Sequence, residues 1–194
     1  MMTVIVNGAA MESDSRSKMV RSAVSLIASR GVNATSFSDV LADSGAPRGS
    51  IYHHFPQGKQ QMAEEAVRLT GAWVLARQHA VDGAGAAEVL SNFIDLWRQV
   101  VLASGGASGC AVAGVAIDTG PAEGELIQAV RTTFRSWTDL LAGQLEAAGI
   151  APSRAASLGL ATVAAMEGAL ILCRAERSSA PLDTVAEELM RLLN

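Results

Sequence analysis

Hydrogen-bond donors are concentrated in one short stretch of this 194-residue chain. The donors between residues 48 and 59 include Arg48, Ser50, Tyr52, His53 and Lys59. Guanidinium, ammonium, hydroxyl and imidazole groups bind phosphate oxygens, and a guanidinium can also donate two parallel bonds to one planar acceptor edge. A protein core has little use for so many donors, because each buried polar group needs a partner. The stretch therefore indicates an exposed surface that binds an anionic partner.

Two short helices joined by a tight turn would present these donors. Ser36 and Asp39 have the spacing of a capping box, which starts the first helix, and Gly45 permits the left-handed conformation that ends it. Pro47 suits the first position of the second helix, because its missing N–H needs no partner there. The pattern predicts a helix-turn-helix. The alternative, a plain αα-hairpin, explains an aromatic core residue such as Phe55 but not the donors.

The run Arg-Gly-Ser-Ile-Tyr-His-His-Phe at 48–55, followed by Lys59, resembles the DNA-binding domain of TetR-family transcriptional regulators. The resemblance covers residues 14–68 and implies that the second helix enters the major groove of a double-stranded DNA operator. The residues then expected to bind DNA are Thr35, Ser36, Arg48, Gly49, Ser50, Tyr52, His53 and Lys59. Arg48 would read a base edge and Gly49 would permit close approach, while hydroxyl, imidazole and ammonium groups would bind phosphate.

Composition agrees with a helical DNA-binding protein that is only weakly basic. Aromatic residues make up 4% of the chain and proline is scarce, which favours helices. The formal net charge is −4, but residues 1–60 carry six Lys and Arg against four Asp and Glu, whereas residues 61–194 carry nine against fifteen. The acidity therefore lies away from the predicted DNA-binding end, where it would repel phosphate. A weakly basic end also implies that two copies act together.

Apolar periodicity and helix-end residues divide the chain into helices. The predicted helices beside the helix-turn-helix cover residues 14–30, 59–80, 86–103, 109–118, 121–148, 152–174 and 181–193. The expected fold class is all-α with about nine helices. We predict a mobile arm over residues 1–13, a three-helix DNA-binding domain over 14–58, and a helical effector-binding and dimerisation domain over 59–194.

Two segments of the predicted C-terminal domain carry further information. Residues 109–118 resemble a segment of the LmrA/YxaF-like subgroup of TetR regulators. Residues 152–174 are apolar on nearly every side, so this helix must be buried against more than one neighbour. By resemblance, the last two long helices pair with those of a second copy, which implies a homodimer. The alternative is that Gly159, Gly168 and the alanines allow close packing within one subunit.

The resemblance also implies a small-molecule effector that changes DNA affinity through a two-state equilibrium. The expected function is a dimeric repressor that an apolar or aromatic effector releases from a palindromic operator. The candidate effector-binding residues are Trp73, Arg77, Phe93, Trp97, Cys110, Phe134, Trp137 and Met166. The same residues would also form an ordinary helical core, so both interpretations stay open.

The sequence gives little indication of a metal site, a redox site or an enzyme active site. His53 and His54 are adjacent, so on a helix they point about 100° apart and cannot easily chelate one ion; no metal or cofactor is expected. Cys110 could act as a redox sensor in an alternative interaction or redox-sensing protein, but an enzyme using it or His79 lacks a recognisable partner. The apolar residues 1–6 are too short for the h-region of a signal peptide, so no export is expected. Cys110 and Cys173 are far apart and not in CxxC spacing, and we expect them to be reduced thiols of a cytoplasmic protein.

Overall fold

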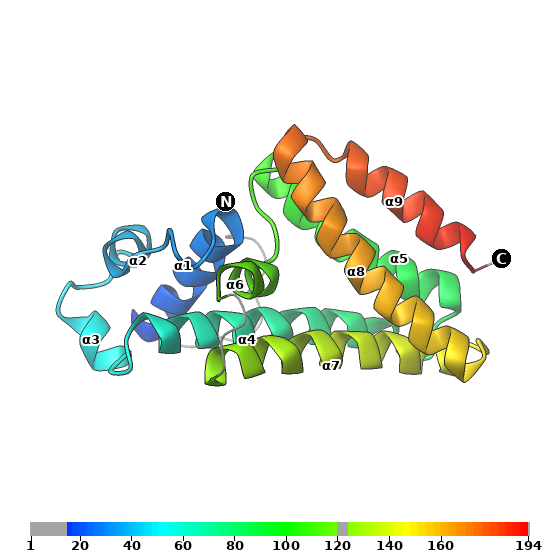
Figure 1. Cartoon of the computed structure of the whole chain (residues 1–194), viewed down its shortest axis with the longest axis horizontal. Helices are drawn as coiled ribbons and strands as arrows, with labels where there is room; N and C mark the ends of the chain where they lie inside the picture. Colours follow the sequence, from blue (N-terminus) through cyan, green and yellow to red (C-terminus); the bar gives the residue numbers. More distant parts are fainter. Residues whose placement is uncertain (1–14, 120–123, 194) are drawn as a thin grey trace. The chain divides into compact units, whose positions relative to one another are not determined.

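The computed structural model describes residues 15–119 and 124–193 of the chain, so the predicted arm over 1–13 and the predicted helix start at Pro121 lie outside the described residues. The described residues form nine α-helices and a short 3-10 turn, with no strand among them (Figure 1). The all-α prediction is therefore confirmed.

The chain divides into two compact units. The first comprises the residues up to Thr70 together with Cys110–Arg131, and the second comprises Gly71–Gly109 together with the residues from Thr132 onward. Two long helices, α4 (Lys59–Gln78) and α7 (Glu125–Ala147), contribute to both units. These units describe packing, so the functional boundary predicted after residue 58 stays a prediction.

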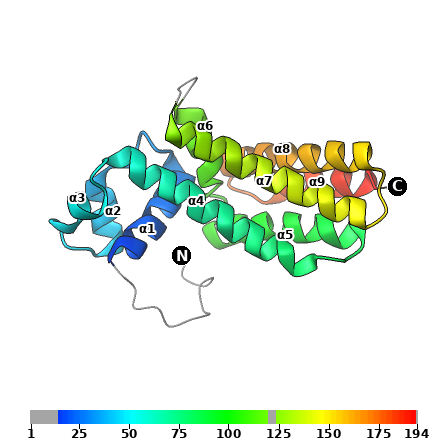
Figure 2. The same cartoon turned by 90° about the horizontal axis from the view of Figure 1, so that it is seen from below.

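The first unit is built around helix α1 (Ser15–Arg30), which ends as predicted at Gly31 with φ +82°. Helices α2 (Phe37–Ser44), α3 (Ser50–His54) and α6 (Ala111–Thr119) pack against α1 (Figures 1 and 2). The apolar residues that are fully buried or nearly so in this unit include Met19, Ala23, Ile27, Val40, Ile51, Phe55, Met62 and Val115. Short helices α2 and α3 are therefore held by a shared core rather than by their own propensity.

The second short helix begins three residues later than the predicted start at Pro47. Residues 48 and 49 form a turn after Pro47, and Gly49 precedes the first helical residue, Ser50, without a side-chain cap. Proline supplies no N–H donor and glycine has low helix propensity, so this lead-in does not extend the helix.

The second unit contains helices α5 (Ala86–Ser104), α8 (Pro152–Glu176) and α9 (Ala180–Arg191), which pack against one another (Figure 1). The predicted end of the connector helix at residue 80 is a 3-10 turn, His79–Val81. Trp97 lies at the centre of this unit and meets Trp73, Phe93 and Trp137 edge to face, with ring centroids 5.8–6.4 Å apart. Such aromatic contacts make α5 the centre of the core.

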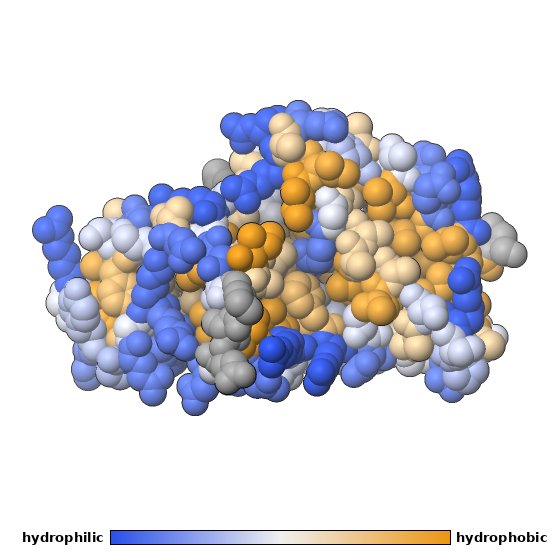
Figure 3. All heavy atoms as spheres, in the orientation of Figure 1, coloured by the Kyte–Doolittle hydropathy of each residue, from blue (hydrophilic) through white to orange (hydrophobic). Residues whose placement is uncertain are grey.

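Helix α8 has two apolar sides with different environments. At Gly159 a Cβ atom would lie 2.9 Å from the Thr138 carbonyl oxygen, so α8 and α7 pack backbone to backbone within the subunit. Gly168 has open space around it, and Leu160, Ile171 and Leu172 are 62%, 54% and 50% exposed. Figure 3 shows apolar side chains gathered over this part of the second unit. One apolar face of α8 is therefore left uncovered in the single chain.

Among the described residues, α8 is the one helix long and apolar enough to cross a membrane by length and composition, and 44% of its most apolar window is buried. The core helix of a soluble protein meets the same two criteria. One side of α8 packs on α7 at Gly159, so burial within the subunit explains the apolar residues on that side.

Candidate nucleic-acid interface

The structure contains both helix-end signals that the sequence predicts for the first helix of the helix-turn-helix. Ser36 caps α2: its hydroxyl accepts the Asp39 N–H at 3.2 Å, and the Asp39 carboxylate accepts the Ser36 N–H at 2.8 Å. Gly45 ends α2 in the left-handed conformation, φ +67°, and donates to the Leu41 carbonyl oxygen at 3.1 Å. The turn therefore reverses the chain with its backbone groups satisfied.

The Asp39 carboxylate also has the electrostatics of a helix cap. Its hydrogen bond from the Ser36 hydroxyl, then the Ser36 N–H and the Arg30 guanidinium 3.0 Å away, lower the pKa of Asp39. A carboxylate at the first turn of α2 also interacts favourably with the helix dipole. The start of α2 is thus stabilised by the ionised form of Asp39.

Helix α3 separates its apolar and donor side chains. Ile51 and Phe55 are each 1% exposed and fix the helix on the core, whereas Tyr52 is 72% exposed and His53 is also exposed. Arg48 and Gly49 are exposed just before the helix, and Ser50 is its first residue. The Tyr52 ring meets Phe37 edge to face at 5.7 Å, which orients its exposed side chain. This arrangement brings Arg48, Gly49, Tyr52 and His53 to one short segment of surface.

The remaining predicted DNA-binding residues have partners within the first unit. Thr35 is fully buried and its hydroxyl donates to the Gly31 carbonyl oxygen at 2.7 Å. The Ser36 hydroxyl is exposed but donates to Asp39 at 2.6 Å, and the Lys59 ammonium donates to the Asn33 carbonyl oxygen at 3.1 Å. Phosphate binding by Thr35 would require its hydroxyl to leave a buried bond. These contacts with phosphate stay predictions, and the structure favours Ser36 over Thr35.

The two adjacent histidine rings, those of His53 and His54, meet edge to face. Their ring centroids are 5.3 Å apart and the rings are inclined at 65°. Within the described part of the chain, no group of three His, Cys, Asp or Glu side chains is placed to hold a metal ion.

The candidate effector-binding residues fall into two groups. Cys110 is buried in the first unit, just before α6, whereas the other seven belong to the second unit. There Phe134 meets Trp137 at 5.5 Å, and the Arg77 guanidinium lies 5.3 Å from the Trp73 ring centroid. These contacts are those of a packed aromatic core, and effector binding by this set stays a prediction.

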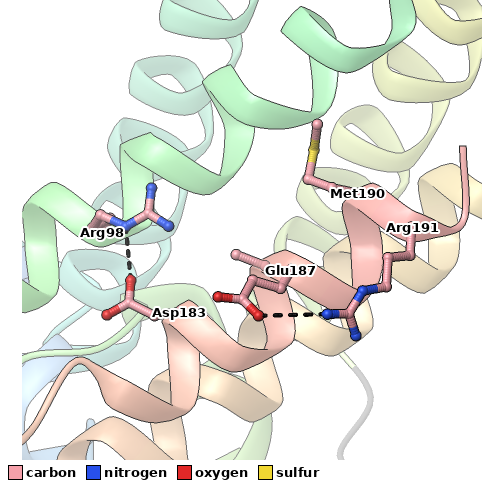
Figure 4. Close-up of a pocket in the computed structure, with 6 residues that line it drawn as sticks. Arg98, Asp183, Glu187, Met190 and Arg191 are labelled. Atoms are coloured by element: carbon pink, nitrogen blue, oxygen red, sulfur yellow. Dashed lines mark hydrogen bonds and ion pairs between the residues drawn. The ribbon is translucent and has the colours of Figure 1, made fainter.

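A charged groove lies elsewhere in the second unit, between α5 and α9 (Figure 4). It has a volume of about 590 Å³ and is lined by Arg98, Asp183, Ala186, Glu187, Met190 and Arg191. Arg98 pairs with Asp183 at 3.0 Å, and Arg191 pairs with Glu187 at 3.8 Å. Because its charges are paired across an open surface, this groove does not suit an apolar effector.

Two separate regions of the chain match known protein families. Residues 20–66 match the family of bacterial regulatory proteins named tetR, and residues 86–188, more than half of the chain, match the C-terminal domain of LmrA/YxaF-like transcriptional regulators. The chain belongs to the TetR family. Its C-terminal part places it with the LmrA/YxaF-like members, as the segment 109–118 indicates.

Relatives and solved structures agree with this TetR assignment. The chain is 40% identical over 183 residues to the HTH-type transcriptional regulator Rv0196 of Mycobacterium tuberculosis, covering 92% of this chain and 93% of the relative. It is 30% identical to LmrA of Bacillus subtilis, covering 87% and 91%. A TetR regulator from Legionella pneumophila has the same fold, with a TM-score of 0.84 at 22% identity over 93% and 98% of the two chains. The chain is therefore a DNA-binding transcriptional regulator of the TetR family.

Nothing in the local sequence predicts two other polar contacts of this TetR protein. Asn33 pairs with Asp118 in the first unit, and Gln78 pairs with Gln144 in the second, at separations of 85 and 66 residues. Short-range patterns cannot signal pairs so far apart in sequence. The first pair links the turn after α1 to α6, and the second links the end of α4 to α7.

Proposed function

We propose that this regulator is a homodimeric repressor that leaves a palindromic operator when a small apolar or aromatic effector binds. The observation that carries the proposal is the sorting of side chains on α3: Ile51 and Phe55 are buried, while Tyr52 and His53 are exposed beside Arg48. A short helix so fixed presents donors on its outer side without exposing its apolar residues.

Each donor then has a role set by its chemistry. The Arg48 guanidinium donates two bonds to one guanine edge in the major groove. Tyr52, His53, Ser36 and Lys59 donate to phosphates and fix the register of α3 on the duplex. For Lys59 this requires exchange of its bond to the Asn33 carbonyl for one to phosphate.

A second copy of the chain covers the exposed face of α8. Leu160, Ile171 and Leu172 form an apolar surface around Gly168, where no side chain keeps a second helix away. Exposed apolar patches of this kind mark protein interfaces, and a two-fold interface presents two identical DNA-binding units. A palindromic operator matches that symmetry.

The effector is assigned to the aromatic core of the second unit. The indole N–H of Trp97 in this core and the hydroxyl of Thr162 on α8 of the same unit are buried without a hydrogen-bond partner in the described part of the chain. An aromatic effector with polar substituents would satisfy such groups, and its binding would shift the equilibrium away from the DNA-bound form. The protein is inferred to act in the cytoplasm and not as an enzyme.

Electrophoretic mobility shift with the DNA flanking its own gene tests the repressor proposal. We expect the wild-type dimer to shift this DNA, Tyr52→Ala and Lys59→Ala to lose the shift, and the surface variant Gln99→Ala on α5 to retain it. Sedimentation of each variant checks that the dimer is intact. Retention of the shift by both Tyr52→Ala and Lys59→Ala would contradict the contact assignment.

Tryptophan fluorescence tests effector binding separately from DNA binding. All three tryptophans lie in the second unit, so their emission reports on the proposed effector site. We expect apolar aromatic compounds from a screen to quench tryptophan emission and to reverse the mobility shift at the same concentrations. Quenching without release of DNA would contradict the effector role.

A further inference from the structure

The turn between α1 and α2 is held by a residue from a distant part of the chain. The Asp118 carboxylate, at the C-terminal end of α6, accepts the backbone N–H of Asn33 at 2.8 Å, and the Asn33 side-chain amide donates to the Asp118 carbonyl oxygen at 3.3 Å. The Asn33 carbonyl oxygen accepts the Lys59 ammonium at 3.1 Å. The N–H, the carbonyl and the side chain of Asn33 are therefore all bonded to residues outside the turn.

Two glycines allow α6 to approach α1 so closely. At Gly31, with φ +82°, a Cβ atom would overlap the Asp118 carboxylate. At Gly114, a Cβ atom would lie 3.0 Å from the Ile27 carbonyl oxygen. Helix α6 thus packs on the backbone of α1, and Asp118 reaches the turn from this position.

We propose that Asp118 is a positioning residue for DNA binding. Residues 31–35 lead directly into Ser36, the cap of α2, so the two bonds between Asp118 and Asn33 fix the entry to the helix-turn-helix. A turn that is ordered before DNA arrives loses less conformational entropy on binding. The proposal rests on DNA binding by the helix-turn-helix and not on which donor meets a base or a phosphate.

The direction of the change in DNA affinity when Asp118 is removed distinguishes positioning from simple charge repulsion. Asp118 is an anion in the unit that binds DNA, so its removal alone would strengthen attraction to phosphate. If Asp118 positions the turn, its removal instead weakens binding. The change in affinity therefore has opposite signs under the two explanations.

The test uses the full-length protein and a duplex selected in vitro by the wild type, with binding followed by fluorescence anisotropy. Wild-type selection of a duplex establishes DNA binding before any variant is compared. We expect Asp118→Ala to weaken binding about tenfold, or about 1.4 kcal/mol. Asp118→Asn, whose amide oxygen can still accept the Asn33 N–H, should stay within about threefold of wild type. Asp139→Ala, which removes an exposed carboxylate of α7 in the second unit, should bind at least as tightly as wild type.

Two further readouts separate positioning from general loss of structure. The slope of log affinity against log salt should be unchanged in Asp118→Ala, because no phosphate contact is removed. Amide hydrogen exchange should rise in residues 31–35 and not in α5. Ile117→Gln, a change at an exposed position of the same helix, should alter neither affinity nor exchange. Tight binding by Asp118→Ala, or unchanged exchange in residues 31–35, would overturn the proposal.

Discussion

Replacement of Gln144 by methionine should destabilise the second unit strongly for a change that conserves volume. Gln144 and Gln78 are 6% and 1% exposed and bond to each other twice. The Gln78 side-chain amide donates to the Gln144 side-chain oxygen, and the Gln144 side-chain amide donates to the Gln78 main-chain carbonyl oxygen, both at 2.9 Å. The Gln144 amide also donates to Asp82 at 2.7 Å. This network joins the end of α4 to α7.

The magnitude follows from the groups left behind. Methionine fills the space but cannot bond, so the Gln78 carbonyl and one amide hydrogen of Gln78 lose buried partners, each at a cost of roughly 1–3 kcal/mol. The Gln78 amide keeps its bond to the Val89 carbonyl at 3.0 Å. Allowing for the gain from a more apolar side chain, we expect a loss of about 3 kcal/mol, a large part of the 5–15 kcal/mol typical of a domain.

Urea unfolding followed by tryptophan emission measures this loss, because Trp73, Trp97 and Trp137 all belong to the second unit. With a slope of about 2–3 kcal/mol/M, the midpoint should fall by about 1–1.5 M. Gln99→Met, at an exposed position on α5, serves as the matched control and should leave the midpoint unchanged.

A double variant tests the pairing itself. Gln78→Met combined with Gln144→Met removes both groups of the side-chain bond and leaves only the Gln78 main-chain carbonyl, so the double variant should lose at least about 1 kcal/mol less than the sum of the single losses. A loss below about 0.5 kcal/mol in Gln144→Met, or strictly additive losses, would refute this account of the network.

Three further outcomes follow from single contacts. Ser36→Ala removes the cap of α2 and should lower the free energy of unfolding by about 1 kcal/mol in thermal unfolding at neutral pH. Because Ser36 lowers the pKa of Asp39, the stability from this pair is present above the unfolded pKa of 3.8 and is lost as pH falls through the folded pKa. The difference in stability between the variant and the wild type should therefore shrink in acid. Leu172→Glu places a charge on the exposed face of α8 and should give a monomer in sedimentation, whereas a dimer would exclude that face. Burial raises the pKa of the Cys173 thiol, so a thiol reagent at pH 8 should modify it slowly until urea unfolds the protein, and rapid reaction of the native protein would contradict its burial.

Local patterns predicted the elements that depend on neighbouring residues. The capping box at Ser36 and Asp39, and the glycine stops at Gly31 and Gly45, are present because each needs contacts only a few positions away. The long helices also follow their apolar periodicity, so α5 begins at the predicted Ala86.

Features that depend on distant residues could not be predicted. Thr35 looks like an exposed donor in the sequence, but the fold buries it completely. Lys59 is engaged by Asn33, and Asn33 by Asp118, through a contact that forms only when α6 packs on α1. Sequence spacing therefore identified the exposed donors of α3 better than the residues that position them.

Sequence discrimination by Arg48 tests the central claim most directly. Competition anisotropy compares the selected duplex with a scrambled duplex of the same composition, for wild type, Arg48→Ala and the control Arg135→Ala, which removes the same charge from an exposed site on α7. The wild type should prefer the selected duplex by at least about 1,000-fold. Arg48→Ala should reduce that preference about tenfold or more, because a bidentate contact with a base contributes about 1–3 kcal/mol of discrimination, and Arg135→Ala should preserve it. Equal loss in both variants, or full preference in Arg48→Ala, would contradict base reading by α3 and its lead-in.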